Sequence, residues 1–499
     1  MLFSSLPFIL GFLPLSFAVY FGLHRQGWML AARAWLLLAS LFFYGWWNPL
    51  YLPLILASIG ANFFIGRAIG RRRARLLAAG GAPLAAPALL GLGVGLNLLV
   101  LAFFKYADFL IGNLNTILVS EYPLPGIVLP LAISFFTFQQ IAYLVDCWRE
   151  GPHDYDFVSY GLFVTFFPQL IAGPIVHHRE MMPQFSRRWN QRTDYRNIAA
   201  GLFIFTLGLF KKVVIADSFA QWVAPGFDQG VELGFFAAWL TSLSYTFQLY
   251  FDFSGYTDMA IGAALLFNIR LPINFNSPYQ AVNIQDFWRR WHITLSRFLR
   301  DYLYIPLGGS RRGWARTQLS LMLTFVLGGL WHGASWMFVI WGALHGVATV
   351  LHRWWQRLGG RMPHWLGWLL TFNFVNIAWV FFRAPDLATA LRILAGMAGL
   401  NGVILPARLL ELFPFLGRLS ADFGNWLDLA HWPASLLAYC VAALLAVLLL
   451  PNSTQLLGRR GWQVRFASRR WAVVLAALFM FALVKLAVSQ DIEFLYFNF

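Results

Sequence analysis

The sequence predicts an all-α fold that crosses a membrane many times, and three observations support this. First, 59% of the 499 residues are hydrophobic and only 12% are charged, whereas soluble domains carry about 25% charged residues. Second, apolar segments recur from residue 6 to residue 489 with no long polar block between them. Third, many of them approach the roughly 20 residues that a helix needs to cross a hydrocarbon core. We therefore expect one membrane domain over residues 1–499.

Apolar segments of suitable length define the expected membrane spans. They lie near residues 6–23, 29–47, 50–69, 85–104, 126–146, 196–215, 233–251, 317–331, 334–351, 366–382, 434–450 and 471–488. Stretches near 157–173, 256–268 and 387–400 are shorter or interrupted, and we expect them to be re-entrant or enclosed by protein. The first segment lacks the basic region and cleavage site of a secretory signal, so it should remain as a span.

Basic residues are grouped in short clusters between the apolar segments. The clusters lie at residues 71–75, 187–196, 311–316 and 459–470, and the net charge is +16. Such clusters are typical of cytoplasmic loops, and the first of them follows the third span, which places the N-terminus outside. No basic platform of exposed aromatic residues accompanies them, which argues against nucleic-acid binding. Cys147 and Cys440 match neither a disulfide framework nor a metal-binding spacing.

Residues 286–304 predict an amphipathic helix with one basic side. Apolar residues recur at steps of three and four residues, namely Trp288, Trp291, Leu295, Phe298 and Tyr302. A helix of this kind can lie in the headgroup region of the membrane. His292 comes four residues after Trp288 and three before Leu295, so it should face the apolar edge. In that position His292 needs a polar partner inside the protein.

His332 is the main candidate for chemistry, because it stands between two long apolar runs. An ionisable group inside a bilayer costs about 2.5 to 3.5 kcal/mol and usually faces a cavity or a partner. Gly328, Gly329 and Gly333 surround His332, and glycines permit a backbone break or the close approach of a ligand. The alternative interpretation is a histidine hydrogen-bonded within a helix interface.

Other polar groups in apolar segments have structural interpretations. His345 lies thirteen residues beyond His332, and we expect it to have a packing or supporting role. Asp252 and Asp258 are six residues apart, which does not suit a paired acid and base on one helix. We expect them to cap or brace a broken helix around Gly255. No Gly-x-Ser-x-Gly motif is present, which argues against a covalent serine enzyme.

After these exclusions, the chemistry that remains is general base catalysis by a histidine on a hydroxyl group, since the pKa of histidine lies near physiological pH. Acyl transfer to an alcohol needs such a base and an activated donor such as a thioester. His177 and His178 are adjacent, so their side chains point in different directions, and we expect no metal site there. The residues alone do not identify the donor.

Several sequence blocks together carry a family resemblance. In chain order they are Ile133-Ser-Phe-Phe-Thr-Phe, Ile171-Ala-Gly-Pro-Ile, Tyr250-Phe-Asp-Phe-Ser-Gly-Tyr-Thr-Asp-Met-Ala-Ile-Gly, Asn274-Phe-Asn-Ser-Pro-Tyr, Phe287-Trp-Arg-Arg-Trp-His-Ile-Thr-Leu-Ser, Arg300-Asp-Tyr-Leu-Tyr-Ile-Pro-Leu-Gly-Gly and Leu330-Trp-His-Gly-Ala. These blocks resemble the membrane-bound O-acyltransferase family, and within it the bacterial branch that contains alginate O-acetyltransferase and the D-alanyl transfer protein of teichoic acid.

The resemblance covers most of residues 1–385. It fades over the divergent spans of residues 386–499 and returns in the closing Glu493-Phe-Leu-Tyr-Phe-Asn-Phe. It implies a ring of about 11 to 13 transmembrane helices, with re-entrant and interfacial helices around a central funnel that leads to the histidine. By this resemblance His332 matches the catalytic histidine of the family, and His292 matches a second polar position that commonly pairs with it.

The resemblance also implies a task for the chain. We expect an enzyme of the cell inner membrane, surrounded by lipid, that takes acetyl from cytoplasmic acetyl-CoA without a tightly bound cofactor or metal. The implied acceptor is a secreted polysaccharide such as alginate or cellulose, and a periplasmic or membrane-anchored acetyltransferase partner would complete the transfer. Two alternatives stay open: transfer of D-alanine or a fatty acyl chain, and a transporter that makes no bonds, which broken segments near Gly255 and Gly333 would suit.

Overall fold

The computed structural model describes residues 1–78, 87–151, 155–171, 173–418, 422–424, 435–457, 469–488 and 495. Residues 459–468 of the last basic cluster, Ala172 of the Ile171-Ala-Gly-Pro-Ile block and nearly all of the closing Glu493-Phe-Leu-Tyr-Phe-Asn-Phe segment lie outside the described residues. Helices make up nearly all of the regular secondary structure in the described residues. Its strands β1 (Ile404–Pro406) and β2 (Asp422–Gly424) pair in parallel, with Ile404 opposite Asp422.

The chain packs as two compact units, each built from segments that are distant in sequence. The first unit contains Met1–Leu209, Tyr256–Ile273 and Leu456–Asn498. The second contains Phe210–Gly255 and Asn274–Gln455. Helix α13 (Phe235–Leu266) contributes residues to both units.

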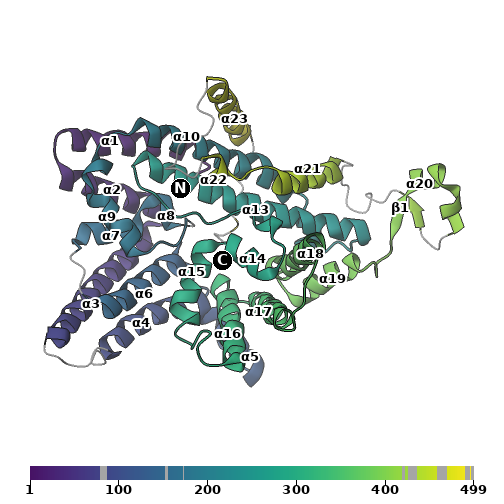
Figure 1. The fold of residues 1–499 in the computed structure, drawn as a ribbon, viewed down its shortest axis with the longest axis horizontal. Coiled ribbons are helices and arrows are strands. Elements are labelled where there is room, and N and C mark those ends of the chain that lie inside the picture. The colour runs from purple at the N-terminus through teal and green to yellow at the C-terminus, as the bar shows by residue number, and fades with distance from the viewer. Residues whose placement is uncertain are drawn as a thin grey trace. The chain divides into compact units, whose positions relative to one another are not determined.

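The first unit is a set of packed helices (Figure 1). Several of them are long and apolar. Its helices are η1 (Pro7–Phe12), α1 (Leu13–Arg25), α2 (Met29–Gly45), η2 (Pro49–Tyr51), α3 (Leu52–Ala78), α4 (Pro87–Leu101), η4 (Ala102–Tyr106), α5 (Ala107–Leu118), α6 (Ile133–Glu150), α7 (Phe157–Thr165), α8 (Phe167–Leu170), α9 (His178–Ser186), η5 (Arg188–Gln191), α10 (Tyr195–Phe210) and α23 (Arg469–Val488). Helix α6 packs against α3 and α4, and α2 packs against α1 and α7.

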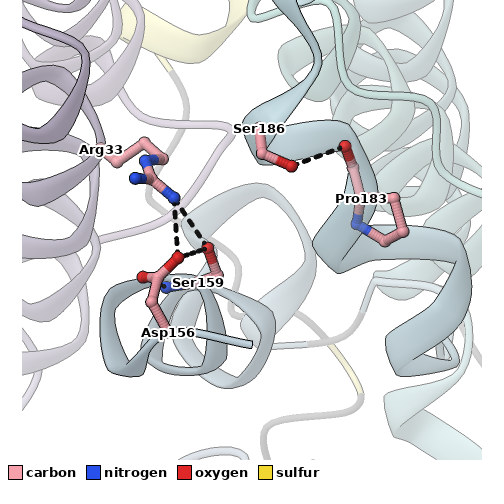
Figure 2. A network of polar contacts seen from close by, with 5 residues as sticks. All are labelled: Arg33, Asp156, Ser159, Pro183 and Ser186. Carbon is pink, nitrogen blue, oxygen red and sulfur yellow. Dashed lines mark hydrogen bonds and ion pairs between the residues drawn. The ribbon is translucent and has the colours of Figure 1, made fainter. Parts of the chain in front are cut away.

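A polar contact fixes the start of α7 in this unit. Figure 2 shows Arg33 of α2 beside Asp156 and Ser159, and its Nη1 donates to both side chains, at 2.9 and 3.0 Å. Asp156 is the N-cap of α7 and accepts from the backbone N–H of Ser159. Burial opposes ionisation of Asp156, but the hydrogen bonds from Ser159 and Arg33 outweigh it and hold the pKa of this carboxyl below its ordinary value. In the same figure the Ser186 hydroxyl donates to the Pro183 carbonyl near the end of α9.

The second unit holds most of the polar residues singled out in the sequence. Besides its part of α13, its helices are η6 (Lys211–Ala216), α11 (Asp217–Ala220), α12 (Ala224–Phe227), η7 (Pro278–Gln280), α14 (Ile284–Arg290), α15 (Ile293–Leu299), η8 (Arg300–Tyr304), α16 (Trp314–His332), α17 (Trp336–Arg357), α18 (His364–Arg383), α19 (Leu387–Met397), α20 (Ala407–Leu412), η9 (Pro414–Arg418), α21 (Ser435–Leu449) and α22 (Ser453–Leu456).

Helices α16 and α17 form a tight antiparallel pair in the second unit (Figure 1). A side chain at Gly342 would collide with the backbone carbonyl of Phe325, and one at Gly329 would collide with that of Phe338. Small residues at these positions let the two backbones approach closely, as in many membrane helix pairs. Helix α18 packs against α17.

In the described part of the chain, six helices are long and apolar enough to cross a membrane, judged by length and composition. They are Pro7–Arg25, Pro49–Leu76, Ala88–Leu118, Tyr195–Ala220, His364–Arg383 and Arg469–Val488. Shorter apolar helices occupy Met29–Gly45, Leu387–Met397 and Ser435–Leu449. The predicted all-α membrane fold is confirmed, while the expected total of spans and their orientation stay predictions.

Two sequence predictions about continuity are wrong. Helix α13 runs unbroken through Gly255, so Asp252 and Asp258 neither cap nor brace a helix break. Residues 256–268 belong largely to this helix and are buried, which bears out the other alternative, that they are enclosed by protein. Conversely, the single helix expected over residues 286–304 is divided into α14, α15 and η8, with the break at Trp291 and His292. Both cysteines, Cys147 and Cys440, are buried.

Candidate functional site

His332 is the last residue of α16, and only 3% of its surface is exposed. Aromatic rings surround the imidazole within the second unit. The ring centroids of Trp331, Trp341 and Phe382 lie 5.0, 5.2 and 5.2 Å from that of His332, and all three meet it edge to face. The imidazole of His332 is therefore enclosed by aromatic rings.

The turn after His332 explains why α16 ends there. Gly333 has an extended backbone, and a side chain at this residue would collide with the ring of Phe338. Ser335 then caps α17, because its hydroxyl accepts from the N–H of Met337 at 3.2 Å. The glycine setting noted in the sequence thus serves a close helix approach and a sharp turn, and it places His332 at the turn.

His292 lies in the same unit, at the break between α14 and α15, and it is fully buried. Its backbone is left-handed, with φ of 41°. Such a conformation is uncommon for a residue other than glycine and costs about 1 to 3 kcal/mol, so the surroundings must hold it in place. Strain of this kind is often found at functional positions.

Asn274 holds the segment around His292. Its side-chain oxygen accepts from the backbone N–H of Thr294 at 3.2 Å, from the Thr294 hydroxyl at 2.9 Å, and contacts His292 Nδ1 at 3.1 Å. Its backbone carbonyl accepts from the N–H of Ile293. Asn274 is therefore the polar partner that we predicted for His292 from the sequence.

This contact assigns the proton on His292. A backbone N–H can only donate, so the Asn274 atom that receives Thr294 must be the amide oxygen. His292 Nδ1 must then donate to that oxygen, which leaves the lone pair of the neutral ring on Nε2. Burial lowers the pKa of His292, which lies outside the membrane-spanning helices, to about 3, so the ring is neutral at physiological pH.

Trp331 stands between the two histidines. Its ring centroid lies 5.0 Å from that of His332 and 6.5 Å from that of His292. The ring of Phe253 covers another side of His292, at 4.9 Å. The structure thus brings the two sequence-predicted site residues into one aromatic cluster, from α16 and from the α14–α15 break.

His345 is buried in the middle of α17, one ring away from His332. The indole of Trp341 lies 4.8 Å from His345 and 5.2 Å from His332. The indole N–H of Trp288 donates to His345 Nδ1 at 3.2 Å. This contact links α14 to α17 and fits the packing role expected for His345.

The other candidates lie elsewhere. Asp252 forms an ion pair with Lys212 at 3.0 Å, and His178 contacts Asp146 through Nε2 at 3.2 Å. Within the described ranges, no group of three or more His, Cys, Asp or Glu residues is placed to hold a metal ion. A cavity of about 370 Å³ bounded by α17, α18 and the start of α14 is lined by neither His332 nor His292.

Sequence reasoning missed two residues of this unit. Asn274 stood in a family-like block, but nothing in the local pattern linked it to a histidine eighteen residues later. Lys212 had a usable signal, because a lysine within an apolar run is as costly as the histidines that were singled out.

Comparisons with known proteins identify the family of the chain. The model of the membrane-bound O-acyltransferase family matches residues 131–384, which include both histidines and Asn274. The chain is 48% identical to the peptidoglycan O-acetyltransferase of Helicobacter pylori, over 100% of this chain and 98% of that protein. It is 42% identical to the probable alginate O-acetylase AlgI of Pseudomonas aeruginosa, over 80% of this chain and 75% of that protein. The teichoic acid D-alanyltransferase of Bacillus subtilis is 26% identical, over 52% of this chain and 70% of that protein.

Proposed function

Because this chain belongs to the membrane-bound O-acyltransferase family, we propose that it transfers acetyl groups across the membrane for the O-acetylation of peptidoglycan outside. The observation that carries the choice of acceptor is the similarity to a peptidoglycan O-acetyltransferase along the full length of both proteins. The alginate O-acetylases match over a smaller share of the chain.

His332 is the proposed general base of the reaction. An acceptor hydroxyl gives its proton to the imidazole while its oxygen attacks the carbonyl carbon of an acetyl thioester. The new C–O bond forms, the C–S bond breaks, and the thiolate leaves with the proton that His332 held. The enclosed position of His332 among Trp331, Trp341 and Phe382 supports this role, because exclusion of water limits hydrolysis of the thioester.

His292 is the proposed partner of His332. With Nδ1 donating to Asn274, the Nε2 lone pair is suited to accept a hydrogen bond from the acceptor hydroxyl and to orient it. Asn274 is then a positioning residue, since it acts through His292.

The donor and the surroundings are also proposals. Acetyl-CoA is a cytoplasmic acetyl thioester and satisfies the chemistry as a substrate, with no tightly bound cofactor or metal. The chain would lie in the cytoplasmic (inner) membrane among lipids, where the donor is on one side and the cell-wall glycan on the other. A membrane-anchored or periplasmic acetyltransferase partner would then carry acetyl to the polymer.

A pair of matched variants tests the central assignment. His332→Gln keeps a hydrogen-bonding side chain of similar size but removes the base, and His345→Gln makes the same change at an equally enclosed histidine of the same unit. Peptidoglycan is isolated from cells carrying each variant, and acetate released by mild alkali is measured. We expect His332→Gln to lose at least about 100-fold in acetate, the lower range for general base catalysis, while His345→Gln retains most of it. Equal acetate from His332→Gln and the unaltered protein, at equal membrane abundance, contradicts the proposal.

Alginate or another exopolysaccharide is the second candidate acceptor, supported by the 42% identity to an alginate O-acetylase. Measuring acetate in peptidoglycan and in secreted polymer from the same cells separates the two. Loss in the secreted polymer alone on removal of the chain would reject peptidoglycan and leave the catalytic assignment standing. Transfer of D-alanine instead of acetyl would appear as D-alanine in the alkaline release.

A further inference from the structure

One face of α13 in the second unit is polar although it is buried. Thr241, Tyr245, Gln248 and Asp252 follow one another at steps of four, three and four residues, so they share one side of the helix. Each is at most 7% exposed. A buried polar stripe of this length needs hydrogen-bond partners.

Three members of the stripe lack hydrogen-bond partners within the described residues. The hydroxyls of Thr241 and Tyr245 and the side-chain carbonyl oxygen of Gln248 are buried without a hydrogen-bond partner there. Each such group costs about 1 to 3 kcal/mol, and native proteins leave few of them unsatisfied. The next face of the same helix differs, because Ser242 and Thr246 both donate to Asn376, at 3.1 and 2.6 Å.

The stripe ends at a buried ion cluster. Lys212 is 2% exposed and lies 2.7 Å from Asp217 and 3.0 Å from Asp252. Buried charges lose several kcal/mol of hydration each, and paired geometry restores only part of it. Water reaching the cluster along α13 would restore more.

Near Tyr245 the stripe approaches exposed charges. The ring of Tyr245 lies 5.8 Å from that of Phe227, and the guanidinium of Arg383 lies over Phe227 at 5.4 Å. Arg383 forms an ion pair of 2.6 Å with Asp228, and these side chains are 25% and 46% exposed.

We propose that this face of α13 binds a file of water molecules that connects the exposed Arg383–Asp228 pair to the buried Lys212 cluster and lets the cluster exchange protons with solvent. Helical rise separates successive members of the stripe by about 4.5 to 6 Å along the axis. One water with two hydrogen bonds of about 2.8 Å spans about 5.6 Å, so single waters bridge the neighbours. Each water then has two protein partners or a protein partner and another water, as buried waters require.

Hydroxyl-radical footprinting with X-ray pulses tests this without any activity measurement, because radicals formed from bound water oxidise the side chains beside it. Tyr245 and Tyr279 are a matched pair in one unit, exposed by 0% and 2%. The Tyr279 hydroxyl is already satisfied, since it donates to the Thr246 carbonyl at 2.8 Å. We expect Tyr245 to be oxidised several-fold faster than Tyr279, and equal slow rates overturn the proposal.

Two variants test whether oxidation of Tyr245 reports water along the whole stripe or only water near the exposed Arg383–Asp228 pair. Gln248→Leu removes the middle hydrogen-bonding position and should lower Tyr245 oxidation toward the rate of Tyr279. Thr246→Val, on the adjacent face, should leave the Tyr245 rate unchanged. If Tyr245 oxidation is unchanged in Gln248→Leu, water is restricted to the region near Arg383 and Asp228, and the proposed file of waters is overturned. An equal fall of Tyr245 oxidation in both variants would indicate a general packing effect and would also overturn the proposal.

Discussion

Replacing Asn274 tests the assignment of His292 most directly. In Asn274→Ala the Nδ1–H of His292 and the N–H of Thr294 both lose their acceptor in a buried site. At about 1 to 3 kcal/mol for each unsatisfied donor, we expect a loss of stability on the order of 3 kcal/mol. The left-handed backbone at His292 loses part of its support as well, although the backbone carbonyl of residue 274 can still accept from the N–H of Ile293.

Asn274→Asp is the more informative variant. It keeps an oxygen acceptor in place for His292 and Thr294, and the amide nitrogen that it removes has no hydrogen-bond partner within the described residues. Its carboxylate, however, stabilises the imidazolium form and raises the pKa of His292. If the neutral Nε2 lone pair orients the acceptor hydroxyl, activity should fall at low pH and recover as the pH rises through the new pKa.

The assay is acetyl transfer from labelled acetyl-CoA by the membrane-embedded protein with its partner and glycan acceptor, followed from pH 5.5 to 9. Thermal inactivation in detergent supplies the stability of each variant. An Asn274→Asp protein with the same pH profile as the unaltered protein would refute the orienting role of His292. An Asn274→Ala protein of unchanged stability would refute the hydrogen-bond assignment itself.

Further predictions concern backbone, packing and charge. His292→Gly should be more stable than His292→Ala by about 1 to 2 kcal/mol, the reverse of the usual order, because glycine tolerates the left-handed conformation; thermal inactivation of both variants decides this. Gly342→Ala should destabilise the protein and reduce acetylation because the added methyl group meets a backbone carbonyl, whereas Gly95→Ala, in open space within α4, should be neutral or stabilising by up to about 1 kcal/mol; melting temperatures of the pair test the difference. Because the pKa of Asp156 is lowered in the folded protein, its contact with Arg33 contributes stability above the ordinary pKa of about 3.9 and loses it as the pH falls through the lower folded value. Asp156→Asn should therefore weaken the acid dependence of the melting temperature between pH 7 and pH 3, and an identical dependence would contradict this.

Much of the fold follows from local composition. Helices such as Pro7–Arg25 and His364–Arg383 can be predicted from their own residues, because a stretch of about 20 apolar residues is stable in lipid whatever the rest of the chain does. His332 and His292 could be singled out on similar grounds, since a polar ring among apolar neighbours is costly unless it is used or paired.

The break at His292 could not be predicted from its own segment. The three- and four-residue steps through Trp288, Trp291 and Leu295 continue across it, so the pattern favours one helix. Hydrogen bonds that the backbone N–H groups of Ile293 and Thr294 donate to Asn274, eighteen residues before His292, stabilise the left-handed residue instead. The error at Gly255 is of the opposite kind, because a glycine costs a helix only about 1 kcal/mol. That cost is too small to interrupt the 32-residue helix α13.

The contact between α16 and α17 also has a kinetic consequence. With Gly329 and Gly342 each lying against a carbonyl of the opposite helix, neither helix can slide or rotate without separating the pair. His332 is therefore fixed to a rigid pair of helices, and we expect access to it to depend on side-chain rotation. Phe382 belongs to α18 rather than to this pair, and its ring contacts both His332 and Phe338. Ring and rotamer motions are much faster than displacements of whole helices, so we expect admission of substrate to His332 not to limit turnover.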